Sequence, residues 1–103
     1  MEGVEKRTAH YPLITMQAEI ALLGAQAFTR AAIDGGVTMG LTIADMLAVV
    51  AALSRREFYK SMTTLRDHRE WQDVYHAPCL NGRTAYIKLT RTADRPVIQF
   101  KEK

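Results

Sequence analysis

Cysteine is nearly absent from this sequence of 103 residues, which contains only Cys79. A single cysteine excludes an intramolecular disulfide and the small secreted scaffolds that depend on disulfides. The three histidines, at positions 10, 68 and 76, have no cysteine partner at the spacing of a zinc site. We therefore expect no metal, a reducing compartment, and a buried packing role for Cys79.

Long apolar runs and glycine-rich phosphate motifs are also missing. The apolar stretches at residues 20–27 and 43–53 are too short to span a bilayer, and the second contains Asp45. The segment before residue 20 carries acidic residues, unlike the basic start of a secretory signal. Neither G-x-x-x-x-G-K-[ST] nor G-x-G-x-x-G occurs, so nucleotide-loop chemistry has no support. The sequence predicts a soluble, cytoplasmic protein that does not engage a membrane.

The length and composition fit one globular domain over residues 1–103, with 48% hydrophobic and 24% charged residues. The positive charge gathers in the second half. Residues 1–54 hold three basic and five acidic residues, a net charge of −2, whereas residues 55–103 hold eleven and six, a net charge of +5. A basic half attracts phosphates through counterion release. On charge alone, a nucleic-acid ligand and an unliganded solvated face are equally good interpretations.

Helical signals fill the first half of the chain. Apolar residues recur at helical spacing over residues 13–23, and Gly24 offers a stop. Thr29 is a candidate cap for a short helix through Ile33 that ends at the two glycines 35 and 36. The first ten or so residues are polar, and we expect them to be poorly ordered.

A second helical signal begins at Thr42, where Asp45 three residues later completes an acidic variant of the capping box. Apolar residues then form one stripe over residues 43–53. Ser54 is a further cap candidate, with Glu57 three residues later, and predicts one more turn of helix.

Strand chemistry replaces the helical period after residue 57. Aromatic, Thr and Met residues predict strands over residues 58–65 and 71–75. Asn81-Gly82 predicts a type I′ hairpin turn, whose two central residues need positive φ, between a strand ending near Leu80 and one over residues 83–92. A turn over residues 93–96 leads to a last strand over residues 97–101, with Pro96 at its start or on an edge. This order predicts an α+β fold in which N-terminal helices pack on one face of a C-terminal antiparallel sheet.

Alternation along residues 83–92 separates the two faces of that strand. Ala85, Ile87 and Leu89 form an apolar core face, so Tyr86 and Lys88 point away from it. The faces of the 58–65 and 71–75 strands are mixed, and either could meet the core. An outward face with Lys, Tyr, Gln and nearby Arg suits single-stranded RNA, because aromatic rings stack on bases and cations hold phosphates.

The same residue types can cleave RNA. Attack of the ribose 2′-hydroxyl on the adjacent phosphorus needs a base, an acid for the leaving 5′-oxygen, and cations for the charge on the phosphate. Lys60 could act as the base if nearby cations lower its pKa, or could stay charged and stabilise the phosphate. His68, beside Asp67 and Arg69, is more typical of a loop residue than of a catalytic base. These residues alone indicate a small basic α+β domain that binds nucleic acid.

The second half of the chain also resembles the MqsR toxin family in the order and spacing of its motifs. The resemblance touches the N-terminus at residues 5–8 and 10 and is faint between residues 11 and 57. It rests mainly on Phe58-Tyr59-Lys60-Ser61-Met62-Thr63-Thr64, Asp67-His68, Trp71-Gln72-Asp73-Val74-Tyr75, Gly82, Tyr86-Ile87-Lys88 and Phe100-Lys101-Glu102-Lys103.

The resemblance implies a RelE-like toxin fold and a sequence-selective mRNA endoribonuclease that needs no metal or other cofactor. It implies cleavage at short GC-containing sites, typically GCU, and inhibition of translation and growth. It also implies a cognate MqsA-type antitoxin, a zinc-binding helix-turn-helix protein that neutralises the toxin and represses their shared operon.

The resemblance assigns roles to particular residues. The family's catalytic lysine in F-Y-K-S-M falls on Lys60, its catalytic glutamine in W-Q-D-V-Y on Gln72, and its hairpin-strand tyrosine on Tyr86. Four further residues are expected to bind substrate: Tyr59, Met62, Lys88 and Arg83. After W-Q-D-V-Y the family usually has an arginine and a proline, whereas residues 76–79 here read His-Ala-Pro-Cys. A cation is lost at neutral pH, so the preferred cleavage site is less firmly implied than the reaction class.

Two other functions fit the same residues. A non-catalytic RNA-binding module would use the same basic face, bind in a strongly salt-dependent way and leave the RNA intact. Alternatively, the basic sheet could serve only to meet an acidic antitoxin or regulator.

Overall fold

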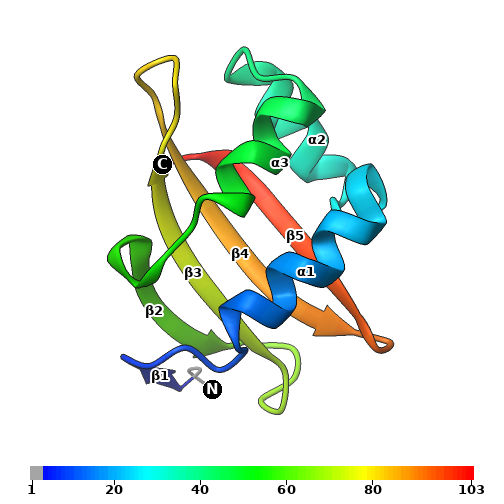
Figure 1. The fold of residues 1–103 in the computed structure, drawn as a ribbon. Helices are drawn as coiled ribbons and strands as arrows, with labels where there is room; N and C mark the ends of the chain where they lie inside the picture. Colours follow the sequence, from blue (N-terminus) through cyan, green and yellow to red (C-terminus); the bar gives the residue numbers. More distant parts are fainter. Residues whose placement is uncertain (1–3) are drawn as a thin grey trace.

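The structure, a computed structural model, describes residues 4–103 (Figure 1). Its elements in chain order are β1 (Glu5–Lys6), α1 (Leu13–Leu23), the 3-10 turn η1 (Gly24–Ala27), α2 (Arg30–Thr38), α3 (Ile43–Ala51), the 3-10 turn η2 (Arg55–Glu57), β2 (Phe58–Thr63), β3 (Trp71–Pro78), β4 (Thr84–Thr92) and β5 (Arg95–Glu102). The strands form an antiparallel sheet in the order β1-β2-β3-β4-β5. The predicted α+β class, with N-terminal helices on a C-terminal antiparallel sheet, is confirmed.

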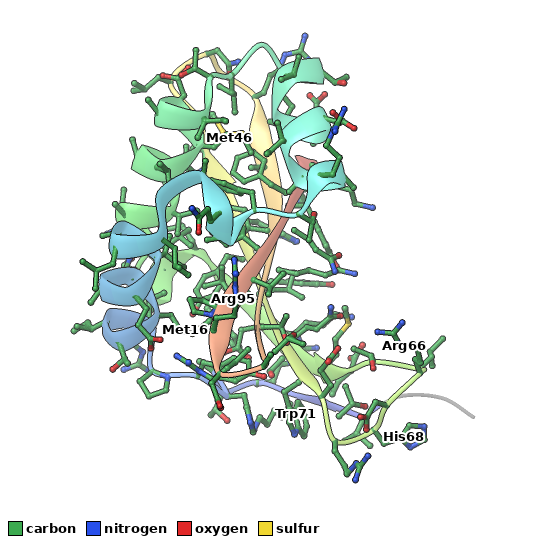
Figure 2. The ribbon with its side chains drawn as sticks, turned by 90° about the vertical axis from the view of Figure 1, so that its right-hand side faces the viewer. Met16, Met46, Arg66, His68, Trp71 and Arg95 are labelled. Atoms are coloured by element: carbon green, nitrogen blue, oxygen red, sulfur yellow. The ribbon has the colours of Figure 1, made fainter. Side chains whose placement is uncertain are left out.

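The hydrophobic core lies between the helices and one face of the sheet. Met16 of α1 and Met46 of α3 are buried there and point toward the strands (Figure 2). The strands contribute Tyr75, Ala77, Ala85, Ile87, Leu89, Ile98 and Phe100. The apolar face predicted for β4 is therefore the core face, and Tyr75 settles which side of β3 points inward. Cys79, 8% exposed, packs in the same core as predicted.

α2 lies along the outer edge of β5. Phe28, just before the helix, forms a parallel bridge with Ile98, and the Thr29 N–H donates to the Ile98 carbonyl at 3.1 Å. Thr29 also caps α2 as predicted, because its hydroxyl accepts from the Ala32 N–H at 3.0 Å. The helix thereby covers a sheet edge that would otherwise expose unpaired backbone groups.

The predicted end of this helix at Gly35 and Gly36 is wrong, because α2 continues to Thr38. Both glycines serve close packing. A Cβ on Gly35 would lie 2.3 Å from the Phe100 carbonyl oxygen, and one on Gly36 would lie 2.2 Å from Met46 Sδ. Only hydrogen side chains allow α2 to approach β5 and α3 this closely.

The other helix signals are confirmed. α1 ends at Leu23, and Gly24 follows with φ 60°. Thr42 and Asp45 form a capping box for α3, and Ser54 and Glu57 form another for η2. No single helix in residues 4–103 is long and apolar enough to cross a membrane, and α2 and α3, which together reach the required length, meet at 99°.

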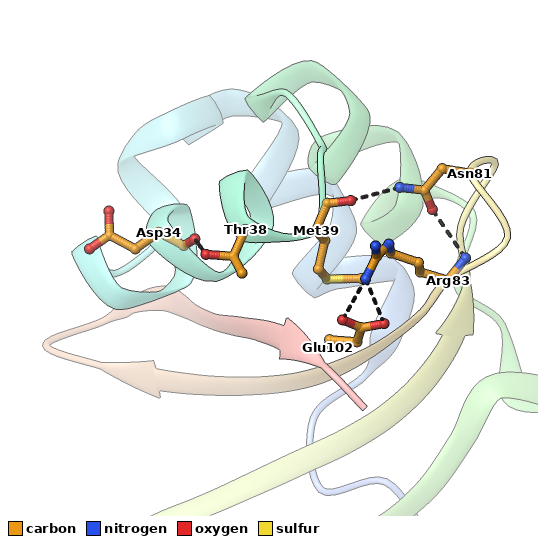
Figure 3. A network of polar contacts seen from close by, with 6 residues as sticks. All are labelled: Asp34, Thr38, Met39, Asn81, Arg83 and Glu102. Carbon is orange, nitrogen blue, oxygen red and sulfur yellow. Dashed lines mark hydrogen bonds and ion pairs between the residues drawn. The ribbon is translucent and has the colours of Figure 1, made fainter.

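The type I′ turn predicted at Asn81-Gly82 is wrong. Gly82 has φ 86°, but Asn81 has no positive φ. The Gly82 N–H donates to the Cys79 carbonyl at 3.0 Å, so Leu80 and Asn81 are the central residues of the turn. The Asn81 amide instead donates to the Met39 carbonyl at 2.8 Å and ties the hairpin to the α2–α3 connection (Figure 3).

The type I′ pattern occurs at the next hairpin. Ala93 and Asp94 have φ values of 51° and 63°, and they join β4 directly to β5. The turn is thus two residues long, shorter than predicted. Pro96 is the second residue of β5, a strand at the edge of the sheet, as predicted.

The N-terminal segment joins the sheet, so the expectation that the first ten residues are poorly ordered is wrong for residues 4–10. Glu5 and Lys6 pair with β2 as the edge strand β1. The buried Asp73 carboxylate holds the following segment, because it accepts from the His10 N–H at 3.0 Å and the Tyr11 N–H at 2.8 Å. Residues 1–3 lie outside the described part of the chain.

Candidate active site

The side of the sheet opposite the core carries the predicted site residues, and we call it the open face. The strand register shows which residues lie on the open face, because residues paired across neighbouring strands point to the same side of the sheet. Lys60 pairs with Val74, Val74 with Lys88, and Lys88 with Gln99. The open face comprises Glu5, Tyr59, Lys60, Met62, Gln72, Val74, His76, Tyr86, Lys88, Thr90, Val97, Gln99 and Lys101.

A β-bulge in β2 brings Tyr59 onto this face. The register shifts between Phe58 and Lys60, so Tyr59 is an extra residue opposite β3. Phe58 packs against the core, whereas the Tyr59 ring stacks on His76 with centroids 4.3 Å apart and planes at 23°. Simple alternation would place Tyr59 on the opposite side from Lys60, and the bulge is the reason that it does not.

Three rings and a lysine form a row across four strands, which we call the aromatic row: Tyr59, His76, Tyr86 and Lys101. His76 pairs with Tyr86, and their ring centroids lie 5.3 Å apart. Tyr86 pairs in turn with Lys101, whose Nζ lies 5.5 Å from the centroid of the tyrosine ring. Aromatic planes with adjacent cations are the surface on which single-stranded nucleic acid stacks.

His76 fills the middle of this row as a neutral ring. Burial lowers the pKa of its imidazole, and the nearby Lys103 charge lowers it further. Its Nε2 is buried with no hydrogen-bond partner in residues 4–103. Protonation would leave a buried N–H donor unpaired, which also favours the neutral form.

Two lysines stand beside the aromatic row. Lys60 Nζ lies 5.4 Å from the Tyr59 ring centroid, and Lys88 Nζ lies 6.0 Å from that of Tyr86. Burial lowers the pKa of Lys88, and the charges of Lys101 and Lys60 contribute in the same direction. The open face therefore concentrates positive charge next to stacking surfaces.

Lys60 has an acidic partner that keeps it charged. Its Nζ donates to Glu5 Oε1 at 2.5 Å, and this hydrogen bond raises the pKa of Lys60, while burial opposes the rise. The same contact lowers the pKa of the Glu5 carboxyl. Of the two roles that the sequence leaves open for Lys60, this geometry favours the charged one.

Two hollows on the open face are lined in common by Lys88 and Gln99. The larger, of about 1050 Å³, is bordered by the β2–β3 connection and by Glu5, Met62 and Gln72. The smaller, of about 390 Å³, lies between the aromatic row and the N-terminal end of α2, and its lining includes Tyr86 and Lys101. Because Lys88 and Gln99 line both hollows, the two together form one track across the sheet. An extended strand of nucleic acid fits this shape better than a compact ligand does.

The predicted catalytic residues Lys60, Gln72 and Tyr86 thus come from three strands to one face. The predicted substrate-binding residues Tyr59, Met62 and Lys88 accompany them. Arg83 does not, because it precedes β4 and its Nη1 binds the Glu102 carboxylate oxygens at 2.9 and 3.1 Å (Figure 3).

His68 also lies elsewhere, exposed in the β2–β3 connection (Figure 2). Within residues 4–103, no three His, Cys, Asp or Glu side chains lie close enough to share a metal ion.

The sequence-based assignment gave no site role to three polar residues that contact predicted site residues: Glu5, His76 and Lys101. Alternation could have found Lys101, since Phe100 is apolar and faces the core. Glu5 lies in the N-terminal stretch touched by the family resemblance but received no role there, because its place beside Lys60 depends on the pairing of β1 with a strand more than fifty residues away.

Comparison with known proteins places the chain in a family. Residues 8–102 match the family described as "Motility quorum-sensing regulator, toxin of MqsA". The mRNA interferase toxin MqsR of Escherichia coli (strain K12) is 39% identical over 100 residues, which cover 97% of this chain and 100% of that protein. The resemblance inferred from the motifs is confirmed, and the chain belongs to the MqsR toxin family.

Proposed function

We propose that this protein is an endoribonuclease toxin that cleaves mRNA in the cytoplasm and is neutralised by an MqsA-type antitoxin. Membership of the MqsR family supports the enzyme class, since the Escherichia coli relative is named an mRNA interferase. The observation that carries the proposal for this chain is the convergence of Lys60, Gln72 and Tyr86 on one face, in a surface of rings and cations.

The chemistry proposed for this site is attack by the ribose 2′-hydroxyl on the adjacent phosphorus, without a metal. Lys60, held charged by Glu5, offsets the negative charge that develops on the phosphate. Gln72 lies in the larger hollow, where its amide can donate to a phosphate oxygen. Tyr86 supplies a proton to the leaving 5′-oxygen.

Recognition falls to the rest of the open face. Bases stack against the aromatic row, and Lys88 contacts the phosphates next to the cut. Arg83, which lines neither hollow, would contact RNA only after leaving Glu102. We propose short GC-containing sites as the preferred sequence. The antitoxin would be a zinc-binding, helix-turn-helix protein.

The test is cleavage of a defined transcript by purified protein in excess EDTA, with mapping of the new 5′-ends. We expect discrete cuts that leave 5′-hydroxyl ends. Lys60→Ala should lower the rate by about 10²-fold or more, because it removes a preorganised charge from the reacting phosphate. Asp34→Asn on α2, at a residue that lines neither hollow, changes the net charge by one unit and serves as the control.

Two results would contradict the proposal. RNA that is bound in a salt-dependent way and recovered intact would indicate the non-catalytic RNA-binding module instead. Cleavage abolished by EDTA would contradict the metal-independent mechanism. The partner is tested by growth of cells that express the toxin. Co-expression of the neighbouring antitoxin gene should rescue growth, whereas an unrelated antitoxin should not.

A further inference from the structure

The chemistry proposed above has no base to take the proton of the 2′-hydroxyl. Lys60 is protonated, and Gln72 cannot accept a proton from a hydroxyl at useful strength. The His76 Nε2 is buried and lies in the aromatic row, outside the lining of the larger hollow. The lining of that hollow includes two carboxylates, Glu5 and Glu70, and Glu5 is the one that touches Lys60.

Resting on the function proposed above, we propose that Glu5, on the edge strand β1, is the catalytic base that takes the proton of the 2′-hydroxyl. Its carboxylate lines the larger hollow together with Gln72 and Lys88. It also touches Lys60, with Oε1 and Nζ 2.5 Å apart. The Glu5 side chain is 53% exposed, against 18% for Lys60, so a substrate can reach the carboxylate.

The order of the strands places a base and an acid on either side of Lys60. Glu5 lies on β1, Lys60 on β2 and Tyr86 on β4, so a phosphate held over Lys60 has a carboxylate on one side and a phenol on the other. Displacement at phosphorus places the attacking and leaving oxygens roughly in line. A base and an acid on opposite sides of the phosphate match those two oxygens.

The step balances within the site. The 2′-hydroxyl gives its proton to the Glu5 carboxylate as its oxygen bonds to phosphorus. The bond from phosphorus to the 5′-oxygen breaks, and that oxygen keeps the electron pair and takes a proton from the Tyr86 hydroxyl. The products are a 2′,3′-cyclic phosphate and a 5′-hydroxyl, and the Glu5 proton returns through water to Tyr86.

The backbone around Glu5 is well held, as a catalytic group requires. The Thr63 N–H donates to the Val4 carbonyl at 2.9 Å, and the Val4 N–H donates to the Thr63 hydroxyl at 2.9 Å. On the other side of β1, Asp73 fixes the backbone of His10 and Tyr11. A short edge strand is thus fastened at both of its ends.

The experiment uses the full-length protein and a short RNA that contains one mapped cleavage site, in EDTA. Glu5→Gln should lower kcat by about 10²-fold or more with little change in KM, because the amide keeps the shape but cannot take the proton. Circular dichroism and thermal melting establish that the variant is folded. Asp34→Asn, which also removes one carboxylate, should cleave at the wild-type rate.

A second variant separates a base from a residue that only holds Lys60. In Glu5→His the acidic limb of the pH–rate profile should move up toward the titration range of imidazole, about pH 6.5. A residue that only orients Lys60 would not shift that limb. The assignment would be overturned if Glu5→Gln cleaves as fast as wild type or faster. It would also be overturned if the acidic limb of Glu5→His stays where it is in wild type. If wild type itself fails to cleave, the proposed function fails and Glu5 is not the cause.

Discussion

The two faces of β3 use adjacent polar residues for opposite purposes. On the core side Asp73 is 1% exposed, and its carboxylate accepts from the Ser61 hydroxyl at 2.6 Å and from two backbone N–H groups of the N-terminal segment. On the open face Gln72 borders a hollow, and the buried His76 Nε2 has no partner in the described chain. The difference indicates that polar groups on the core side hold the fold, whereas those on the open face remain available for a substrate.

Replacing Gln72, on the open face of β3, should lower activity and leave the fold stable. Gln72→Leu keeps the side-chain volume but removes the amide donor, so we expect the cleavage rate to fall by about 10²-fold. The free energy of unfolding should change by less than about 1 kcal/mol. Initial rates on a defined transcript and urea denaturation measure the two effects. A Gln72→Leu protein that cleaves normally would place Gln72 outside the reaction.

Replacing Asp73, on the core side of β3, should instead destabilise the fold. Asp73→Ala leaves one hydroxyl and two backbone N–H groups without their acceptor in a buried place, so we expect unfolding to become easier by about 3 kcal/mol. Ser61→Ala removes only one of these bonds and should cost about 1 kcal/mol. Urea denaturation checks both values. Equal losses in the two variants would contradict the view that Asp73 anchors the N-terminal segment.

Features that are decided by near neighbours along the chain could be predicted from the sequence. Short-range signals were sufficient for the helix caps at Thr29, Thr42 and Ser54, because capping is decided within three residues. They failed at Gly35 and Gly36, where contacts with β5 and α3 allow the helix to continue.

The candidate site divides in the same way. Alternation placed Tyr86 and Lys88 on the outward side of β4, but it could not place Tyr59, because a bulge is not visible in the apolar pattern. The motifs of the family predicted roles for Lys60 and Gln72. Glu5 depends on long-range pairing of β1 with β2, which neither alternation nor motif spacing specifies.

A change outside both faces of the sheet should alter stability alone. Ala93 adopts φ 51° in the type I′ turn between β4 and β5, a conformation that costs alanine about 1 kcal/mol and that asparagine tolerates better. Ala93→Asn should therefore stabilise the protein by about 0.5–1 kcal/mol, measured as a higher urea midpoint. The cleavage rate should stay at the wild-type value. A lower midpoint would contradict the assigned turn.

The smallest expected effect concerns the neutral ring in the aromatic row. Burial lowers the pKa of His76 below its ordinary value of 6.5, so the unfolded chain binds more protons than the folded one as the pH falls through this range. The stabilising contribution is complete above that value and is lost as the pH drops below it. Lys103 acts in the same direction, and the Tyr59 and Tyr86 rings flank His76.

His76→Phe keeps a ring between the two tyrosines and removes the titration. Its melting temperature should therefore fall less than that of wild type between about pH 7.5 and pH 5.5. Some slope should remain, because burial also lowers the pKa of His10, which stacks on Trp71 on the other side of the sheet. Identical slopes in the two proteins would mean that His76 titrates as it does in the unfolded chain. The lack of a hydrogen-bond partner for Nε2 would then cost no folding free energy. The contrast with Asp73, in which open-face polar groups are left free to bind a substrate, would be weaker.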